Sequence, residues 1–323
     1  MSFRLGLIGA CAFACLASPV LAQEDASKYP SRPIHIVVGF AAGGGNDVIA
    51  RIYGQKLSED LGQPVIVENK PGAGAIVATE YVSKAAPDGY TLLVGATGMA
   101  INQSLYAKLP YDSVRDFVAI SELASFPLIL VVNASSPVKS VAELVAYAKA
   151  NPDKTNYGSS SASFQLVTEL FKQNTGAPMQ AIPYKSANES VLAVISGQVT
   201  TTIADAGSVY NQIKSGTVRA LAVAAPKRLD DLPDVPTMKE AGADVDAILW
   251  SGIFAPKATP PEIVSKLEAE FVKIAKQPDV IGRLKPLGVE TVGSSSVEFS
   301  KIVAADLARW SEVAKAANIK AEP

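Results

Sequence analysis

The sequence is poor in the residues that most catalytic and metal sites require. Among its 323 residues there is one histidine, His35, and there are two cysteines, Cys11 and Cys15. A Ser-His-Asp or Cys-His nucleophilic site would therefore have to use His35 alone. Structural zinc, iron–sulfur clusters and thiol redox centres need groups of cysteine or histidine that this sequence lacks. We therefore expect no metal, no cofactor and no enzymatic activity.

An excess of either charge is also missing. Lys and Arg together number 29, Asp and Glu number 31, and the formal net charge is -2. This balance gives no global electrostatic reason to bind nucleic acid, so no nucleic-acid partner is expected. Hydrophobic residues make up 48% of the chain, which excludes a disordered tail. At ~100–200 residues per domain, the length predicts two domains.

Residues 1–22 have the pattern of a secretory signal peptide. Arg4 gives a basic start, an apolar run follows to Leu16, and Val20-Leu21-Ala22 resembles a cleavage site. Both cysteines lie in this segment, so the predicted mature chain is exported and has none. Its stability is expected to come from core burial and not from disulfides.

Predicted strands and helices alternate along the rest of the chain. The first unit has expected strands at 34–40, 65–68 and 91–94, with helices at 47–61 and up to about 85. The second unit has expected strands at 128–132, 155–157, 181–184, 201–203 and 220–224, with helices at 141–150 and 163–174. Long amphipathic helices are expected at 263–275 and 296–317. This alternation predicts mostly parallel sheets covered by helices on both faces.

The predicted domain division has two chain crossings, near Phe126-Pro127 and near 250–252. Residues 23–126 and 250–323 would form one domain, with the final helices packed on it, and residues 127–249 would form the other. Two crossings between two sheets make a hinge. The cleft between the domains is then the expected place for a ligand.

Three turns rich in glycine or serine are each expected between a strand and a helix. They are Gly39-Phe40-Ala41-Ala42-Gly43-Gly44-Gly45-Asn46-Asp47, Pro71-Gly72-Ala73-Gly74 and Gly158-Ser159-Ser160-Ser161-Ala162-Ser163. Glycine lets a ligand approach the backbone, and the free N–H groups of a helix start favour an anion. The spacing fits neither a P-loop nor a dinucleotide fingerprint. Because open α/β sheets hold ligands at the carboxyl ends of strands, the turns predict an anion site. The alternative is an ordinary tight turn with Asn46, Asp47 or a serine capping the helix.

Four other residues carry weaker signals. His35 alternates with apolar residues on a predicted strand, which favours a structural role. Asp205 ends a predicted strand and would be either a helix cap or a pocket carboxylate. Trp250 and Trp310 are expected to fill the core.

From Tyr29 to the last helix, the chain resembles the substrate-binding proteins of tripartite tricarboxylate transporters, the Bug or TctC-like family. The markers are short but numerous and in order. They include Tyr29-Pro30, Arg32-Pro33-Ile34, Phe40-Ala41-Ala42-Gly43-Gly44-Gly45, Asn69-Lys70-Pro71-Gly72-Ala73-Gly74, Pro87-Asp88-Gly89-Tyr90, Pro183-Tyr184-Lys185, Leu232-Pro233-Asp234-Val235-Pro236-Thr237 and Trp250-Ser251-Gly252.

The resemblance implies a periplasmic, two-domain receptor of the Venus-flytrap type (type II-like) that binds a small carboxylate in the cleft between its domains. Two loops would grip the carboxylate through backbone amides and small hydroxyl groups, and Asp205 would be a polar contact on the far side. The candidate ligand-binding residues are Phe40, Ala41, Gly43, Gly44, Gly45, Asn46, Asp47, Gly74, Ala75, Ser159, Ser160, Ser161, Ser163 and Asp205. The family often has glycine where Ala75 and Ser186 stand, and threonine or serine where Asn46 stands.

The resemblance further implies a monomer that delivers its solute to the permease subunits of a tripartite tricarboxylate transporter. Two alternatives remain open at this point. One is an exported carboxylate-processing enzyme using Asp47 and Asp205 as a carboxylate pair. The other is a solute receptor that reports to a sensor kinase.

Overall fold

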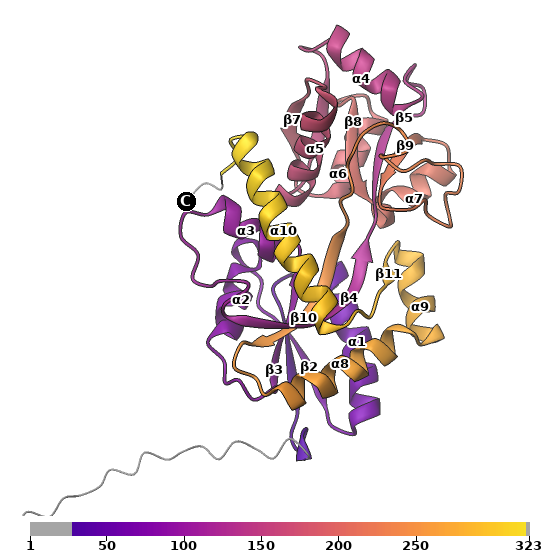
Figure 1. Cartoon of the computed structure of the whole chain (residues 1–323). Helices are drawn as coiled ribbons and strands as arrows, with labels where there is room; N and C mark the ends of the chain where they lie inside the picture. Colours follow the sequence, from indigo (N-terminus) through magenta and orange to yellow (C-terminus); the bar gives the residue numbers. More distant parts are fainter. Residues whose placement is uncertain (1–27, 321–323) are drawn as a thin grey trace, which may run out of the picture.

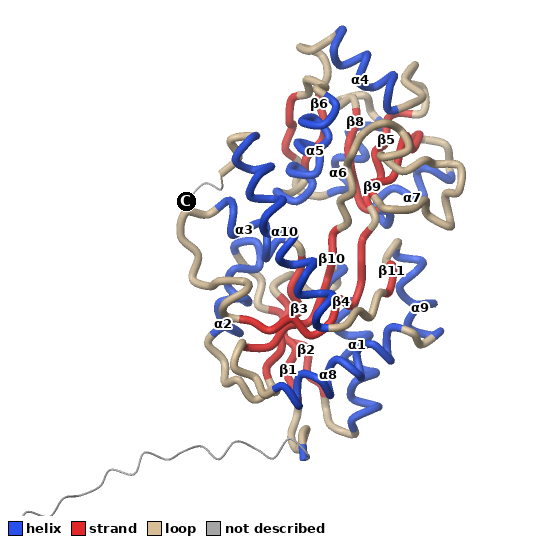
Figure 2. The backbone as a smooth tube through the Cα atoms, in the orientation of Figure 1, coloured by secondary structure: helices blue, strands red, loops and turns tan. Residues whose placement is uncertain are grey.

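The computed structural model describes residues 28–320, so the predicted signal peptide lies outside the described residues. In this part of the chain the strands form one six-stranded and one five-stranded sheet (Figures 1 and 2). The larger sheet has the spatial order β11 (Glu290–Thr291), β4 (Phe117–Phe126), β10 (Leu249–Pro256), β3 (Thr91–Ala96), β1 (Ile34–Val38), β2 (Val65–Asn69). The smaller has the order β7 (Gln180–Pro183), β6 (Asn156–Ser159), β8 (Thr201–Asp205), β5 (Leu128–Asn133), β9 (Val218–Ala224).

Successive residues of a strand point to opposite faces of the sheet, and both faces of each sheet carry apolar side chains. Helices therefore cover both faces. The larger sheet is flanked by α1 (Gly45–Leu61), η2 (Ala73–Ala75), α2 (Ile76–Ser83), α3 (Gly98–Leu105), α8 (Pro261–Ala275), α9 (Pro278–Leu284), η3 (Lys285–Leu287) and α10 (Ser296–Ala316). The smaller sheet is flanked by α4 (Val141–Ala150), α5 (Ala162–Thr175), α6 (Ala187–Ile195) and α7 (Ala206–Lys214). No helix among the described residues is both long and apolar enough to span a membrane.

The predicted two-unit α/β fold is confirmed, but the sheets are mixed and not mostly parallel. The β-α-β units give parallel pairs, β1 with β2 and β3, and β6 with β7 and β8. By contrast, β10 is antiparallel to β3 and β4, β11 to β4, and β5 to β8 and β9. The difference arises at the crossings, because β4 leads the chain out of the larger sheet and β10 leads it back in the opposite direction.

The chain passes from the larger sheet to the smaller between Phe126 and Leu128 and returns with β10, which begins at Leu249. We propose that the two sheets with their helices are the two domains expected from the sequence. The larger sheet and its helices are called lobe 1 below, and the smaller sheet and its helices lobe 2.

The last helix does not pack on lobe 1 alone. In α10, Phe299 and Val303 belong to a lobe 1 core cluster, whereas Trp310 and Val313 are buried with residues of lobe 2. The amide of Gln173 on α5 also donates to the Val313 carbonyl at 3.3 Å. Helix α10 therefore connects the lobes along one side of the molecule (Figure 1).

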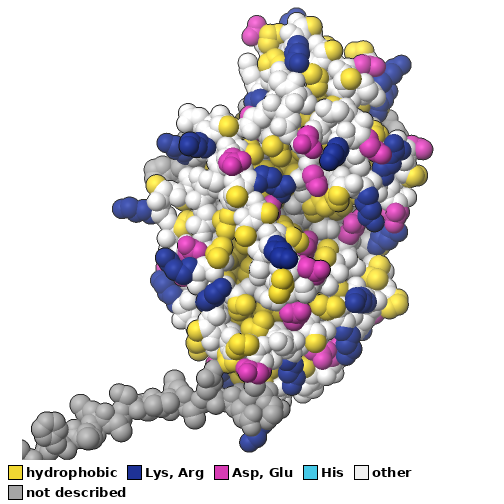
Figure 3. All heavy atoms as spheres, in the orientation of Figure 1, with side chains coloured by type: hydrophobic (Ala, Val, Ile, Leu, Met, Phe, Trp, Pro, Cys, Tyr) yellow, Lys and Arg dark blue, Asp and Glu magenta, His cyan; other side chains and the backbone are white. Residues whose placement is uncertain are grey.

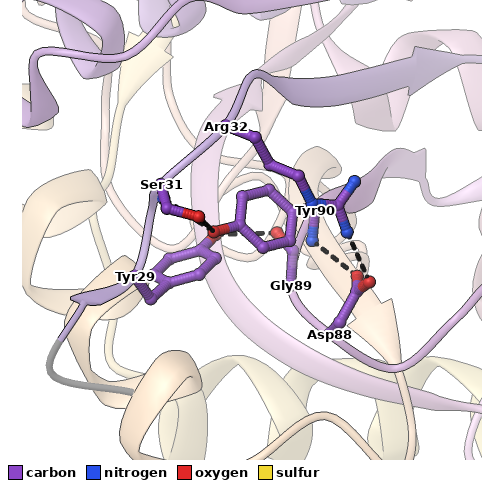
Figure 4. Close-up of polar contacts among 6 residues, drawn as sticks. All are labelled: Tyr29, Ser31, Arg32, Asp88, Gly89 and Tyr90. Atoms are coloured by element: carbon purple, nitrogen blue, oxygen red, sulfur yellow. Dashed lines mark hydrogen bonds and ion pairs between the residues drawn. The ribbon is translucent and has the colours of Figure 1, made fainter. Parts of the chain in front are cut away.

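The first described residues are bound to the turn before β3 by hydrogen bonds and an ion pair. Figure 4 shows the six residues involved, which are Tyr29, Ser31, Arg32, Asp88, Gly89 and Tyr90. The Tyr29 hydroxyl donates to the Gly89 carbonyl, and the Ser31 N–H donates to the Tyr90 hydroxyl, both at 2.7 Å. Arg32 pairs with Asp88 at 2.7 Å and lies 3.9 Å from the centre of the Tyr90 ring. Three of the sequence markers, Tyr29-Pro30, Arg32-Pro33-Ile34 and Pro87-Asp88-Gly89-Tyr90, therefore meet in a structural contact.

Candidate functional site

A cavity of about 550 Å³ lies between the lobes, within the size range of small-molecule sites. Its walls come from the carboxyl ends of strands in both sheets and from the segments that cross between them. The lining residues are Phe40, Gly43, Gly45, Asn46, Val48, Gly74, Ala96, Thr97, Gly98, Ile101, Asn102, Phe126, Ser161, Ala162, Ser163, Phe164, Asp205, Leu249, Trp250, Leu284, Leu287 and Val289. Figure 3 shows hydrophobic side chains gathered over the middle of one face, where the lobes meet.

The glycine-rich turn after β1 brings the start of α1 to this cavity. Phe40, Gly43, Gly45 and Asn46 line it. Gly43 has a φ of 82°, which favours glycine at this position. Helix α1 has Gly44 at its N-cap. No side chain caps this helix, so no capping side chain bonds to its first backbone amides. The Asn46 side-chain oxygen is buried without a hydrogen-bond partner among the described residues.

Asp47 is turned away from the ligand space and braces the loop instead. Its carboxylate accepts hydrogen bonds from the Gly43 N–H at 2.8 Å, Arg51 Nε at 3.0 Å and Asn69 Nδ2 at 2.8 Å. Burial opposes ionisation of this carboxyl, but the bonds from Arg51, Gly43 and Asn69 outweigh it and lower the pKa of Asp47. Asp47, Ala41 and Gly44 are not among the lining residues.

The second glycine turn contributes one residue. Gly74 lines the cavity, and its carbonyl accepts a hydrogen bond from Asn102 Nδ2 at 3.1 Å. Ala75 does not line it. A Cβ placed on Gly39 would lie 2.4 Å from the Ala75 Cβ, so Ala75 packs tightly beside the turn after β1.

The serine turn of lobe 2 brings the start of α5 to the opposite wall. Ser161 and Ser163 line the cavity, whereas Ser160 does not, and Ser159 is buried at the end of β6. Ser161 stands at the N-cap of α5 and makes no side-chain cap bond.

Other serine N-caps in the described chain behave differently. Ser140, Ser186 and Ser295 each accept a hydrogen bond from the N–H of a glutamate three residues later. After Ser161 the third residue is Phe164, and both the hydroxyl and the first amides of α5 are left for another partner. The uncapped serine is thus the one that lies at the cavity.

A third helix start, at α3, was not among the predicted site residues. Thr97, Gly98 and Asn102 line the cavity directly after β3. The Thr97 hydroxyl accepts the Trp250 N–H at 2.7 Å, and α3 has no side-chain cap. The available signal was a third strand followed by small and hydroxyl residues, Ala96-Thr97-Gly98, at the same edge of the sheet.

The tryptophans have different surroundings. Trp250 lines the cavity although only 2% of its surface is exposed, and its indole N–H donates to Asp306 on α10 at 2.7 Å. Trp310 is fully buried, as expected for a core residue. His35 lies away from the cavity, with its Nδ1 2.5 Å from Glu68 Oε1.

The remaining wall is apolar, with one acid. Its hydrophobic residues are Val48, Ala96, Ile101, Phe126, Ala162, Phe164, Leu249, Leu284, Leu287 and Val289. Asp205 caps α7, and its two oxygens accept from the Ser208 N–H at 3.0 Å and the Ser208 hydroxyl at 2.9 Å. Within residues 28–320, Asp205 is the one charged residue that lines the cavity, and Lys, Arg and His do not line it. Among the described residues, no cluster of three or more His, Cys, Asp or Glu could hold a metal ion.

Two α/β lobes joined by crossing strands around a ligand-sized cavity define a periplasmic-binding-protein fold. The chain belongs to the TctC family, described as the tripartite tricarboxylate transporter family receptor, whose model matches residues 49–319. The predicted family is therefore confirmed, and it is a family of receptors.

Known relatives cover almost the whole chain. BugT of Bordetella pertussis is 34% identical over 326 residues, 99% of this chain and 99% of BugT. A protein of R. palustris solved with adipate is 35% identical, with a TM-score of 0.77 over 90% of this chain and 99% of its own. MatC from Rhodopseudomonas palustris, solved with bound malate, is 31% identical, with a TM-score of 0.73 over 88% of this chain and 99% of its own.

Proposed function

We propose that this protein is a periplasmic, monomeric receptor that captures a small carboxylate by closing its lobes and delivers it to the permease of a tripartite tricarboxylate transporter. Family membership supports transport, and the adipate and malate of the two R. palustris relatives support a carboxylate. The proposed signal peptide supports export.

One observation supports an anionic ligand. Three helices, α1, α3 and α5, begin at the cavity without a side-chain cap, two from lobe 1 and one from lobe 2. Free helix-start amides favour an anion, and a charge-assisted hydrogen bond contributes roughly 1.5–3 kcal/mol. In the part of the chain that the structure describes, no lysine or arginine lines the cavity, so the amides and hydroxyl groups would select the anion by their geometry.

Closure follows from the same arrangement. Only a ligand that binds the closed state more tightly shifts the equilibrium between open and closed lobes. A carboxylate held by α1 and α3 on one side and by α5 on the other makes contacts that exist together only when the lobes approach. The ligand itself would therefore supply the free energy of closure.

The structure favours binding over catalysis at this site. The enzyme alternative needs Asp47 and Asp205 to act as a pair on one ligand. Asp47 is buried, bonded to Gly43, Arg51 and Asn69, and does not line the cavity. The two carboxylates are thus not presented together to a ligand.

Calorimetric titration of the mature chain tests the proposal. The probes are adipate, malate, hexanoate and benzoate, each beside its neutral amide. We expect at least one carboxylate to bind at least about tenfold more tightly than its amide, since each lost charge-assisted bond is worth that much or more. Bound acid should be recovered unchanged. Equal binding of acids and amides, or no binding of any acid, would contradict the proposal, and turnover of the acid would favour an enzyme.

Delivery to a permease needs a separate experiment. Cells lacking this gene should lose uptake of the acid identified by titration and regain it on complementation with the wild-type gene. Normal uptake in the deletion strain would argue against the transport role while leaving carboxylate binding intact.

A further inference from the structure

Trp250 forms part of the cavity wall and is bound on both sides of its backbone to the start of α3. It lines the cavity with 2% of its surface exposed. Its backbone N–H donates to the Thr97 hydroxyl at 2.7 Å, and the Thr97 N–H donates to its carbonyl oxygen at 3.1 Å. Thr97 also lines the cavity and stands at the N-cap of α3. The positions of Trp250 and of the α3 start are therefore fixed together.

The indole ring of Trp250 is held from outside the cavity. It meets Phe299 of α10 edge-on, with ring centres 5.2 Å apart, and Phe254 in a tilted contact at 6.0 Å. Its N–H donates to Asp306 Oδ2, also on α10, at 2.7 Å. Aromatic packing tolerates a range of geometries, whereas a charge-assisted hydrogen bond favours one direction of the N–H. Asp306 therefore sets the orientation of a ring in the cavity wall.

Asp306 is held in turn by Arg309, one helical turn later. Asp306 is 3% exposed and is not among the residues that line the cavity. Its Oδ1 accepts a hydrogen bond from Arg309 Nη2, and Arg309 Nη1 donates to the carbonyl of Asp246. Asp246 lies on the segment that returns from lobe 2, just before β10. One turn of α10 thus holds both the Trp250 side chain and the chain that leads into its strand.

The burial of this ion pair points to orientation more than to stability. Desolvation of two buried charges offsets most of their attraction, so such a pair adds little net stability. The Asp306 carboxylate nevertheless gives the indole N–H a fixed, strong acceptor. A group that is already oriented before ligand arrives need not be ordered on binding, which favours affinity.

Resting on the proposed function, we infer that Asp306 is a positioning residue for the ligand site. It orients the Trp250 ring and, through the Trp250 backbone, the start of α3, which is one of the uncapped helix starts at the cavity. Carboxylate affinity thus depends on α10, although the residues of α10 are not among those that line the cavity.

A double-mutant cycle tests whether Asp306 acts through Trp250. The mature chain is titrated calorimetrically with adipate, malate, hexanoate and benzoate. Asp306→Asn makes the acceptor neutral and removes the ion pair with Arg309, and should weaken binding about fivefold to tenfold. Trp250→Phe keeps an aromatic ring without the N–H and should weaken binding to a similar extent. The double variant should be at most about twofold weaker than the weaker single variant, because both changes break the same connection.

The two tryptophans of the chain give a spectroscopic readout of the same bond. The Trp310 indole nitrogen is buried without a hydrogen-bond partner among the described residues, whereas that of Trp250 donates to Asp306. In protein labelled with ¹⁵N-tryptophan, the bonded indole proton should therefore resonate further downfield. Trp250→Phe assigns the two resonances. Asp306→Asn should move the Trp250 resonance upfield and that of Trp310 less.

Control variants separate positioning from stability. Glu312→Gln removes an exposed carboxylate from the same helix and should change neither affinity nor the indole spectrum. Leu267→Ala leaves a cavity in the buried core of lobe 1 and should lower the melting temperature without changing affinity. If Asp306→Asn does not fold, Arg309→Gln takes its place in the cycle. It removes the partner of Asp306 and should weaken binding about threefold.

Each outcome supports or contradicts the inference. Wild-type affinity in the folded variant, losses that multiply in the double variant, or an unmoved Trp250 resonance would overturn the positioning role and leave the proposed carboxylate receptor standing. An affinity loss in Leu267→Ala equal to that in Asp306→Asn would also overturn it, since stability alone would then explain both. Failure of every acid to bind the folded wild type would overturn the proposed function, and the inference with it.

Discussion

Asp47 shows at the scale of single residues why a polar side chain in a glycine turn need not contact ligand. Its carboxylate is the common acceptor for donors from the turn, from α1 and from β2. Asn69 Nδ2 also donates to the Phe40 carbonyl at 3.0 Å, so the same cluster holds both ends of the turn. The shape of the loop at the cavity therefore depends on a residue that does not line it.

Replacing Asp47 with alanine should destabilise the protein and weaken ligand binding together. The donors lose their acceptor, and the expected loss in the free energy of unfolding is about 1–3 kcal/mol. Urea denaturation measures it. Glu59→Ala, an exposed change on the same helix, should stay within about 0.5 kcal/mol. An equally small loss in the free energy of unfolding for Asp47→Ala would show that the hydrogen bonds to Asp47 do not stabilise the protein.

Glu122 is a buried acid outside the cavity. It lies on β4 with 6% of its surface exposed. Burial, and to a lesser extent the negative charge of Asp306, raises its pKa to about 7. The native state therefore holds this proton at pH values where the unfolded chain has released it.

The stability of the wild type should fall as pH rises from about 4.5 to about 7, since the native state binds more protons than the unfolded state in that window. Glu122→Gln removes this dependence. At pH 8 the variant should be more stable than the wild type by on the order of 2–3 kcal/mol, and at pH 4.5 the two should agree. Denaturation at both pH values tests this, with Glu312→Gln on the exposed side of α10 as control. A constant difference at the two pH values would contradict the shifted pKa.

At the scale of elements, helix caps distinguish structural helix starts from ligand-facing ones. Ser140, Ser186 and Ser295 are each followed by a glutamate at the third position. Each of these serine side chains accepts a hydrogen bond from that glutamate's N–H and so caps its helix. Ser161 does not. The same residue type therefore has two roles, and the difference lies in whether its hydroxyl is already bonded.

Paired serine substitutions test this distinction. Ser186→Ala should lower the free energy of unfolding by about 1 kcal/mol and leave ligand affinity unchanged. Ser161→Ala should leave stability nearly unchanged and weaken carboxylate binding about fivefold to tenfold. Thermal denaturation and titration with the acid found to bind provide the two readouts. A stability loss in Ser161→Ala equal to that in Ser186→Ala, with unchanged affinity, would assign Ser161 to the fold alone.

At the scale of the whole molecule, the lobes touch on two sides of the cavity. Helix α10 connects them through Trp310 and Val313 on one side. On the other side, the start of α7 meets the segment after η3, where a Cβ on Gly288 would lie 2.4 Å from the Gly207 backbone nitrogen. This second contact joins two backbones that approach closely because both residues are glycine.

A side chain at Gly207 should hold the lobes apart. We expect Gly207→Ala to weaken ligand binding at least about tenfold while each lobe stays folded, because the added Cβ blocks this contact between the lobes. Titration measures the affinity, and small-angle X-ray scattering with saturating ligand measures the remaining compaction. Gly282→Ala, where a Cβ meets nothing within 4 Å, is the control. Wild-type affinity and compaction in Gly207→Ala would show that this contact is not needed for closure.

Much of the fold could be predicted from the sequence because strand–turn–helix patterns are local. The helix expected at 141–150 is observed as Val141–Ala150, and the last helix, expected at 296–317, as Ser296–Ala316. The crossing strands β4 and β10 were not predicted. They contain Glu122, Ser125 and Gly252, which weaken the usual strand pattern, and they are strands because they pair with each other within the larger sheet.

The sequence by itself determined two α/β units and the small, polar turns at the ends of β1 and β6, since periodicity and turn chemistry depend on neighbouring residues. Only the tertiary structure decided which turn residues face the cavity, because it turns Asp47 away from the cavity toward Gly43 and leaves the Ser161 hydroxyl at the cavity without a cap bond. It also placed Leu287 and Val289 in the same cavity as the α1 start, more than 200 residues earlier in the chain. Such a juxtaposition is set by sheet order and chain crossings, which no local pattern contains.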